Sequence, residues 1–147
     1  MNFKHSGDMG DIVFSLPVIK ELGGGILYLD PEGGEQEPLV AWNNYNKTKL
    51  DEKSIDNLKP ILEAQDYIKE VKLWTPSVTV DYNLDKFRSH VRHNNLSDSH
   101  LAAFALPFEE RNKKWLNVHP KKLDKPYIIA RSCRYHGNFS FWEQIDP

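Results

Sequence analysis

Apolar residues along the first part of the chain recur in turn at the spacing of strands and of helices. Residues 2–5 predict a short first strand. Residues 11–22 predict a helix, because their apolar positions share one broad face and a run of glycines follows. Pro17 lies inside this helix and lacks a backbone N–H, so we expect a kink or a late helix start.

The next elements continue this alternation. The unbroken apolar run at residues 26–29 predicts a buried strand. We interpret the polar, glycine-bearing stretch over 32–53 as a long excursion from the sheet. Apolar residues at helical spacing then predict a helix over 55–62, despite Pro60 within it, and residues 67–74 alternate as a strand does.

The middle of the chain predicts shorter elements. Residues 78–84 are strand-like, and residues 86–88 are predicted to begin a turn or a short helix. Ser97 is predicted to cap a helix over 98–106, whose interior has good helix propensity. A further strand is predicted over 114–118.

The last residues of the chain predict a boundary between two structural units. A charged linker with two prolines covers 119–126, and it precedes a predicted strand over 127–130 and the start of a helix over 140–145. We therefore divide the chain into a domain over 1–118, this linker, and a short segment over 127–147. Strands that alternate with helices predict an α/β fold, with a Rossmann-like, largely parallel sheet flanked by helices.

Composition narrows the classes of function. The 147 residues suit one domain, and their net charge of −2 gives no bulk attraction to nucleic acid. The single cysteine, Cys133, cannot form an internal disulfide, and no apolar run approaches the length of a membrane span. The N-terminus lacks the pattern of a signal peptide. We therefore expect a cytoplasmic protein with no membrane span, no nucleic-acid partner and no cofactor.

The most informative chemistry lies between the first predicted strand and the first predicted helix. Two pairs, Gly7-Asp8 and Gly10-Asp11, are three residues apart. Glycine lets the backbone turn sharply or approach a ligand closely, and the helix start offers free N–H groups and a positive dipole end. A phosphate suits this spot, and the carboxylates could hold a sugar hydroxyl or accept a proton. The alternative is a tight turn in which an aspartate only caps the helix.

Basic residues provide candidate anion contacts elsewhere. Arg131 and Arg134 follow the predicted strand 127–130 at a spacing that suits a loop around a phosphate, which a guanidinium can bind through two N–H groups. The alternative is that one of them pairs with a surface carboxylate. The basic segment 86–92 could assist an anionic ligand, but a solvated helix face is the commoner explanation.

The histidines predict no metal site. His90, His93 and His100 match no zinc-ligand spacing, and the one thiol is remote from them in sequence. His5 and His136 flank the two candidate regions, and we interpret them as solvated loop residues rather than ligand contacts.

Two segments resemble one enzyme family. Residues 6–17, with the sequence SGDMGDIVFSLP, resemble the opening of heptosyltransferase-type glycosyltransferases. Those are two-domain GT-B enzymes that move a sugar from a nucleotide-sugar donor. Residues 125–135 are similar to the first strand and the following turn of the family's donor-binding second domain.

The resemblance implies roles for particular residues. It makes this chain half of a GT-B fold, with Asp11 as the proposed catalytic base and Asp8 as the second candidate. Two groups of ligand-binding residues then follow, one at each motif: Gly7, Met9 and Gly10, and Arg131, Arg134 and Tyr135. The segment 127–147 would be the truncated start of the second domain, which in the family is similar in size to the first.

Three functions stay open at this point. The first is a glycosyltransferase-like domain that binds a nucleotide sugar or a related phosphorylated ligand and transfers the sugar, either as a fragment or with a homo-oligomer completing the site. The second is a binder that sequesters or senses a nucleotide-like small molecule without catalysis. The third is a structural or interaction module, since a fold alone does not fix function.

Overall fold

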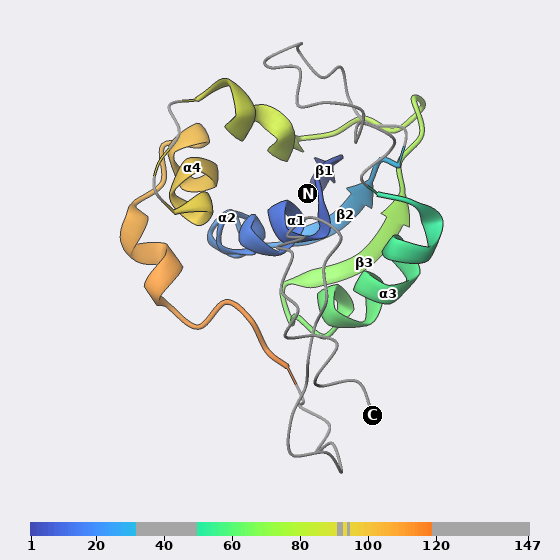
Figure 1. The fold of residues 1–147 in the computed structure, drawn as a ribbon, viewed down its shortest axis with the longest axis horizontal. Helices are drawn as coiled ribbons and strands as arrows, with labels where there is room; N and C mark the ends of the chain where they lie inside the picture. The colour runs from blue at the N-terminus through green and yellow to red at the C-terminus, as the bar shows by residue number, and fades with distance from the viewer. Residues whose placement is uncertain (32–49, 91–92, 94, 119–147) are drawn as a thin grey trace, which may run out of the picture.

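Four parallel strands organise the part of the chain that the computed structural model describes, which comprises residues 1–31, 50–90, 93 and 95–118. The strands lie in the order β3-β2-β1-β4, and their bounds are β1 (Asn2–His5), β2 (Gly25–Leu29), β3 (Ile68–Leu73) and β4 (Tyr82–Asn83) (Figure 1). Phe3 of β1 is paired with a residue of β2 on one side and a residue of β4 on the other. The small parallel sheet confirms the α/β prediction and is consistent with a Rossmann-like fold.

Helices connect β1 to β2 and β2 to β3, which is the usual connection between parallel neighbours, whereas β3 and β4 are joined without a helix. Two short helices lie between β1 and β2, and a longer one lies between β2 and β3. The α-helices are α1 (Met9–Phe14), α2 (Leu16–Glu21), α3 (Glu52–Glu63) and α4 (Leu96–Ala103), and two 3₁₀ helices are η1 (Leu84–Ser89) and η2 (Phe108–Asn112). The chain builds β1, β2 and β3 outward in one direction and then returns to place β4 on the other side of β1.

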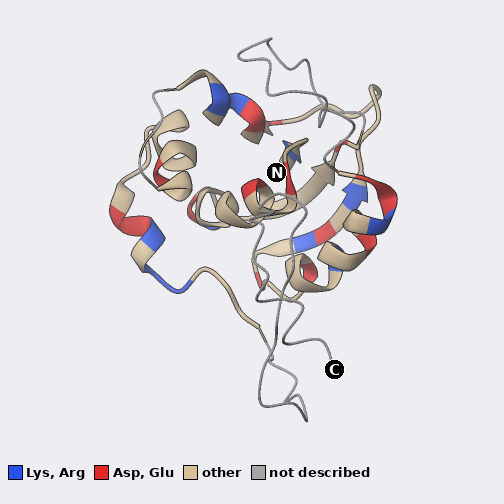
Figure 2. Cartoon of the chain, viewed as in Figure 1, with Lys and Arg blue, Asp and Glu red and all other residues tan. Residues whose placement is uncertain are grey.

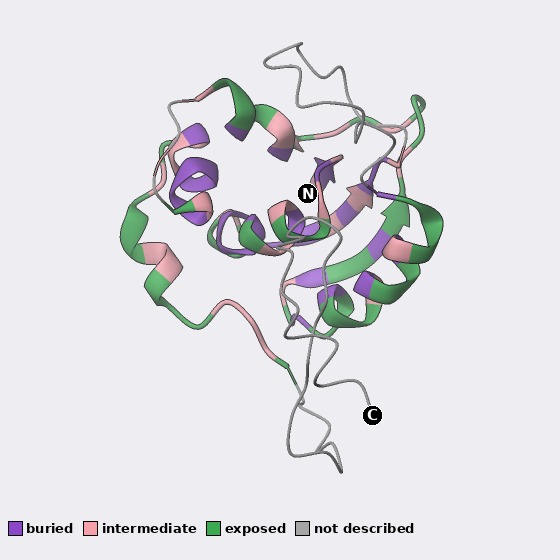
Figure 3. Ribbon diagram, in the orientation of Figure 1, coloured by how far each residue is buried: buried purple, intermediate pink, exposed green. Residues whose placement is uncertain are grey.

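The core lies where the strands meet the helices (Figure 3). Phe3, Leu27 and Leu29 are fully buried on the strands, and the apolar faces of α1, α2 and α3 cover them together with Leu101 of α4. The residues that α1, α2 and α3 contribute to this cluster are Ile12, Leu16, Val18, Ile19, Ile55, Leu58 and Leu62. The helical periodicities predicted for 11–22 and 55–62 are therefore confirmed, although Ile61 is 41% exposed.

The helix is interrupted near Pro17, where we expected a kink or a late helix start. Helices α1 and α2 follow each other directly and are separated at Ser15, two residues before the proline. Pro17 lies in the first turn of α2, where its missing N–H costs little. The hydroxyl of Ser15 donates to the carbonyl oxygen of Ile12 over 2.7 Å, which satisfies a polar group at the break.

The strand predicted over 114–118 is wrong, since these residues form neither strand nor helix. The backbone there forms its hydrogen bonds with side chains and not with a neighbouring strand. The Asn117 N–H donates to the side-chain oxygen of Gln65 over 2.7 Å, and the Asn117 carbonyl accepts from the Gln65 amide over 2.9 Å. The Tyr67 hydroxyl donates to the Trp115 carbonyl.

Other boundaries also differ from the sequence-based expectation. The strand-like pattern over 78–84 yields only the two residues of β4. Asn95, not Ser97, caps α4, because the Asn95 side-chain oxygen accepts from the Ser97 N–H over 2.8 Å. Most of the 32–53 excursion and all of 119–147 lie outside the described residues. Among the described residues, no helix is long and apolar enough to cross a membrane.

The glycine run between α2 and β2 provides a test of the fold. Gly23 and Gly24 have φ angles of +89° and +71°, and a β-carbon on Gly24 would lie 2.1 Å from the carbonyl oxygen of Tyr67. We expect Gly23→Ala to lower the free energy of unfolding by about 1 kcal/mol through backbone strain, because the one atom that its β-carbon would approach, Met1 Cε at 3.3 Å, is the end of a flexible side chain. Gly24→Ala should cost about 3 kcal/mol or more, because the overlap is with backbone. Urea unfolding measures both, and equal losses would contradict this packing.

Candidate functional site

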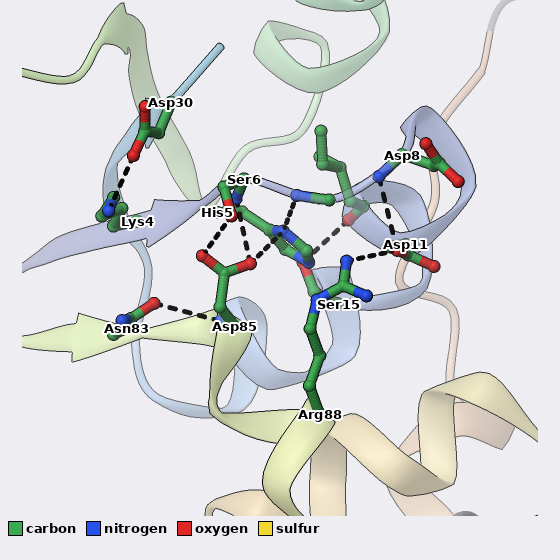
Figure 4. A network of polar contacts seen from close by, with 12 residues as sticks. Lys4, His5, Ser6, Asp8, Asp11, Ser15, Asp30, Asn83, Asp85 and Arg88 are labelled. Carbon is green, nitrogen blue, oxygen red and sulfur yellow. Dashed lines mark hydrogen bonds and ion pairs between the residues drawn. The ribbon is translucent and has the colours of Figure 1, made fainter. Parts of the chain in front are cut away.

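The order of the strands predicts where on the sheet a ligand would bind. The chain reverses its direction of travel across the sheet between β1 and β4, and parallel α/β sheets bind ligands at the carboxyl ends of strands at such a switch point. Residues 6–8 form the turn after β1, residues 9–11 form the first turn of α1, and η1 begins directly after β4. Figure 4 shows these two segments facing each other. The Gly-Asp turn therefore lies where the fold alone would place a site.

Asp85, the second residue of η1, joins the two segments. Its Oδ1 accepts the Ser6 N–H over 3.0 Å, and its Oδ2 accepts the Ser6 hydroxyl over 2.7 Å. The side chain of Asn83 accepts the Asp85 N–H and fixes the start of η1. Burial opposes ionisation of Asp85, but its contacts with His5 and Ser6 outweigh burial and lower its pKa to about 2. The carboxylate is therefore charged at neutral pH.

Asp11 of α1 and Arg88 of η1 form an ion pair, which is a second contact between these two segments. Arg88 Nη2 lies 2.8 Å from Asp11 Oδ2, and in Figure 4 the arginine reaches from η1 to the turn. The same Oδ2 accepts the Asp8 N–H over 3.3 Å, as half of a capping box between Asp8 and Asp11. The side chains of Arg88 and Asp11 are 38% and 17% exposed. A carboxylate and a guanidinium thus meet side by side within reach of solvent.

The two glycines of the turn have different surroundings. A β-carbon on Gly7 would meet three side-chain atoms: His5 Cε1 at 2.6 Å, Asp11 Oδ2 at 2.7 Å and Arg88 Nη2 at 2.8 Å. Gly7 therefore allows these three groups to converge. A β-carbon on Gly10 would meet nothing within 4 Å. Met9, between the two glycines, is 46% exposed.

His5 is buried, and its interpretation as a solvated loop residue is wrong. It ends β1 with its ring fully inaccessible, and its ring centroid lies 5.4 Å from that of His100 on α4. Phe87 of η1 packs against His100 at 3.9 Å between centroids. Burial, reinforced by His5 and Arg88, lowers the pKa of His100 to about 3. His100 is therefore neutral at physiological pH.

A second polar cluster lies at the same edge of the sheet, at the ends of β1, β2 and β3. Lys4 Nζ lies 2.8 Å from Asp30 Oδ2 and 3.9 Å from the centroid of the Trp74 ring. Both charged side chains are largely buried. An ion pair and a cation–π contact thus tie the ends of three strands together.

The sequence predicted only some of the residues that meet at this site. The turn after β1 and the first turn of α1 hold Gly7, Asp8, Met9, Gly10 and Asp11, as predicted, but the partner that η1 contributes was missed. Asp85 carried a signal, because it is a polar residue directly after a predicted strand. For the basic segment 86–92 the sequence allows a contact to an anionic ligand or, more commonly, a solvated helix face, and the structure pairs Arg88 of this segment with Asp11. The helix η1 carries charges of both signs (Figure 2).

The remaining candidate site residues are not part of the chain that the structure describes. Arg131, Arg134 and Tyr135 lie outside the described residues, as do Cys133 and His136. Within the part of the chain that the structure describes, no group of three histidine, cysteine, aspartate or glutamate side chains is placed to hold a metal ion. Comparison with known proteins found no matching family model, no matching curated protein and no matching solved structure.

The two glycines provide a matched pair of variants. Gly7→Ala should lower the free energy of unfolding by about 1–3 kcal/mol, because the new methyl group overlaps the buried His5 ring. Gly10→Ala should raise it by up to about 1 kcal/mol, because alanine favours the helix and the position is open. Chemical denaturation measures both changes. A Gly7→Ala protein as stable as the parent would contradict the convergence on Gly7.

The lowered pKa of His100 makes the free energy of unfolding depend on pH. Its pKa is about 3 in the folded protein against 6.5 for the free side chain, so the unfolded chain binds more protons between these values. Its contribution to stability is complete above pH 6.5 and is lost as the pH falls toward 3, at up to about 1.4 kcal/mol per pH unit. His100→Phe should flatten this slope, and His90→Gln, at a partly exposed histidine, should not. Thermal unfolding from pH 7 to pH 4 gives the comparison.

Proposed function

We propose that the carboxyl edge of the sheet at β1 and β4 binds a phosphorylated, hydroxyl-bearing small molecule such as a nucleotide sugar. The observation that carries this proposal is the Asp11–Arg88 pair, which lies at the switch point of the sheet and reaches solvent. We further propose that the domain is the Rossmann-like, acceptor-side half of a GT-B glycosyltransferase, as its motif at residues 6–17 implies.

Each member of the pair has a role in such a reaction. The guanidinium of Arg88 matches an anionic oxygen of the ligand, and the Asp11 carboxylate takes the proton from the attacking hydroxyl. Asp11 Oδ2 is bonded to Arg88 before any ligand arrives. An anion that binds Arg88 competes with this bond, so ligand binding would release the carboxylate to act as a base. Exposed ion pairs are weak enough for such exchange.

The phosphates of the donor need additional cationic contacts. Arg131, Arg134 and Tyr135 are the residues that the resemblance assigns to this task. They would stabilise the departing nucleotide diphosphate, while residues 7–11 face the acceptor.

A binder without catalysis is the second candidate, and one observation favours it. Asp11 already serves as the reciprocal member of a capping box with Asp8, so its carboxylate has a structural use without any reaction. In that case the same edge would hold a phosphorylated ligand that is released unchanged.

Two variants separate these functions. We expect uridine, adenosine, guanosine or cytidine nucleotide sugars to raise the Tm, since a ligand at a hundred times its Kd stabilises by about 2.7 kcal/mol. Arg88→Gln should abolish the shift. Asp11→Asn should keep binding but remove sugar transfer or donor hydrolysis. Lys59→Gln, at an exposed residue of α3, is the control that should change neither.

The outcomes are distinct. Binding that survives in Asp11→Asn, with ligand recovered intact from the parent protein, supports the binder and excludes transfer. The absence of a thermal shift with every nucleotide sugar would contradict both candidates and leave a structural module.

A further inference from the structure

Gln65 binds the main chain of one distant residue through both halves of its side-chain amide. Its Oε1 accepts the Asn117 N–H over 2.7 Å, and its Nε2 donates to the Asn117 carbonyl oxygen over 2.9 Å. The same Nε2 donates to the Ile61 carbonyl oxygen of α3 over 2.6 Å, which fixes the orientation of the amide. Gln65 is buried, and these bonds use both of its N–H donors and its oxygen. The amide therefore gives Asn117 the pair of hydrogen bonds that a neighbouring strand would give.

Two further side chains bind the residues that precede Asn117. Lys20 Nζ of α2 donates to the Lys114 carbonyl oxygen over 2.5 Å, and the Tyr67 hydroxyl donates to the Trp115 carbonyl oxygen. Burial raises the pKa of Tyr67, so its hydroxyl keeps the proton that it donates. On the side of this segment, every atom in these hydrogen bonds belongs to the main chain. The identity of the side chains there is therefore not what the bonds recognise.

Side-chain packing and hydrogen bonding contribute differently to this contact. Trp115 and Leu116 are partly buried against the core cluster, which favours contact of the segment with the domain. Apolar burial is non-directional, so it does not fix which residue lies opposite Gln65. Hydrogen bonds do fix it, because they weaken steeply when the distance or the angle departs from the preferred values. A shift of the segment by one residue would break all the bonds described above at once.

These three side chains lie at the amino edge of the sheet. Tyr67 directly precedes β3, and its carbonyl oxygen accepts the Gly25 N–H over 2.9 Å where β2 begins. Figure 1 shows residues 113–118, in orange, on the side of the sheet where β3 starts. The Asp11–Arg88 pair lies at the carboxyl ends of the strands, which is the opposite edge. The chain therefore passes residue 118 at the edge away from the candidate site.

We propose that Lys20, Gln65 and Tyr67 form a main-chain clamp, a binding site for a peptide backbone that fixes the register of residues 114–117. The clamp thereby sets the position from which residues 119–147 continue. Gln65 is its central member, because it supplies both a donor and an acceptor to one residue. The clamp goes beyond the proposed function and needs no ligand. Its test uses the ligand-free protein, whereas thermal shifts with nucleotide sugars test the proposed function.

Amide hydrogen exchange of the 147-residue chain measures the role of Gln65. Gln65→Met keeps the length of the side chain but loses its N–H donors and its strong acceptor, so the Asn117 amide should exchange with solvent about tenfold faster than in the parent. Asn57→Met replaces an exposed amide side chain of α3 and should leave that exchange unchanged. An Asn117 amide that is equally protected in the parent and in a folded Gln65→Met protein would overturn the proposal.

Two substitutions at Asn117 distinguish recognition of the main chain from recognition of the side chain. Asn117→Ala keeps both main-chain groups, so trypsin should cleave after Lys114 as slowly as in the parent. Asn117→Pro removes the N–H that donates to Gln65, so this cleavage should become about tenfold faster. Each rate is divided by that of a synthetic peptide with the same residues, which removes the effect of sequence on trypsin itself. Equal acceleration by both substitutions would contradict a main-chain clamp.

The double variant shows whether Gln65 and Asn117 act through the same bonds. Gln65→Met and Asn117→Pro remove opposite ends of one hydrogen bond, so their combination should speed cleavage no more than the stronger of the two single substitutions. Effects that multiply would mean that the two residues act independently, and the proposal would fail. Circular dichroism shows whether each variant folds. If Gln65→Met does not fold, the two Asn117 variants decide.

Discussion

The Asp85 carboxylate is the contact on which the candidate site depends. It joins Ser6 to η1 across 79 positions of sequence, and no local preference of either segment would bring them together. Parallel strands force long connections, so the loops after β1 and β4 meet only once the sheet order is established. The carboxylate then fixes their separation with short hydrogen bonds. The pairing of Asp11 with Arg88 follows from that fixed distance.

Two polar contacts join the same two segments here, and the difference in their burial gives them opposite consequences. The deeper one joins the Asp85 carboxylate to Ser6, and its loss is costly because it would leave a buried carboxylate without its hydrogen bonds. The outer one joins Asp11 to Arg88 near solvent, where ion pairs contribute little stability and exchange partners readily. A rigid inner contact beneath a replaceable outer contact is an arrangement suited to binding.

Sequence patterns predicted those parts of the fold that depend on neighbours in the chain. The strand over 2–5, the break at Pro17 and the helix over 55–62 each have a local cause and are confirmed. The strand predicted over 114–118 is wrong because Gln65 and Tyr67, distant in sequence, satisfy its backbone. The burial of His5 and the pairing of Arg88 depend on where α4 and β4 lie, which periodicity cannot show.

Gly7 and Gly10 call for different explanations. Gly7 is required by the protein itself, because His5, Asp11 and Arg88 converge where its side chain would be. Gly10 has no such constraint, since its surroundings are open and its φ angle is not among the positive ones. In a helix, glycine is about 1 kcal/mol less favourable than alanine. Internal packing therefore does not account for Gly10, whereas the close approach of the proposed ligand to the backbone at that point would.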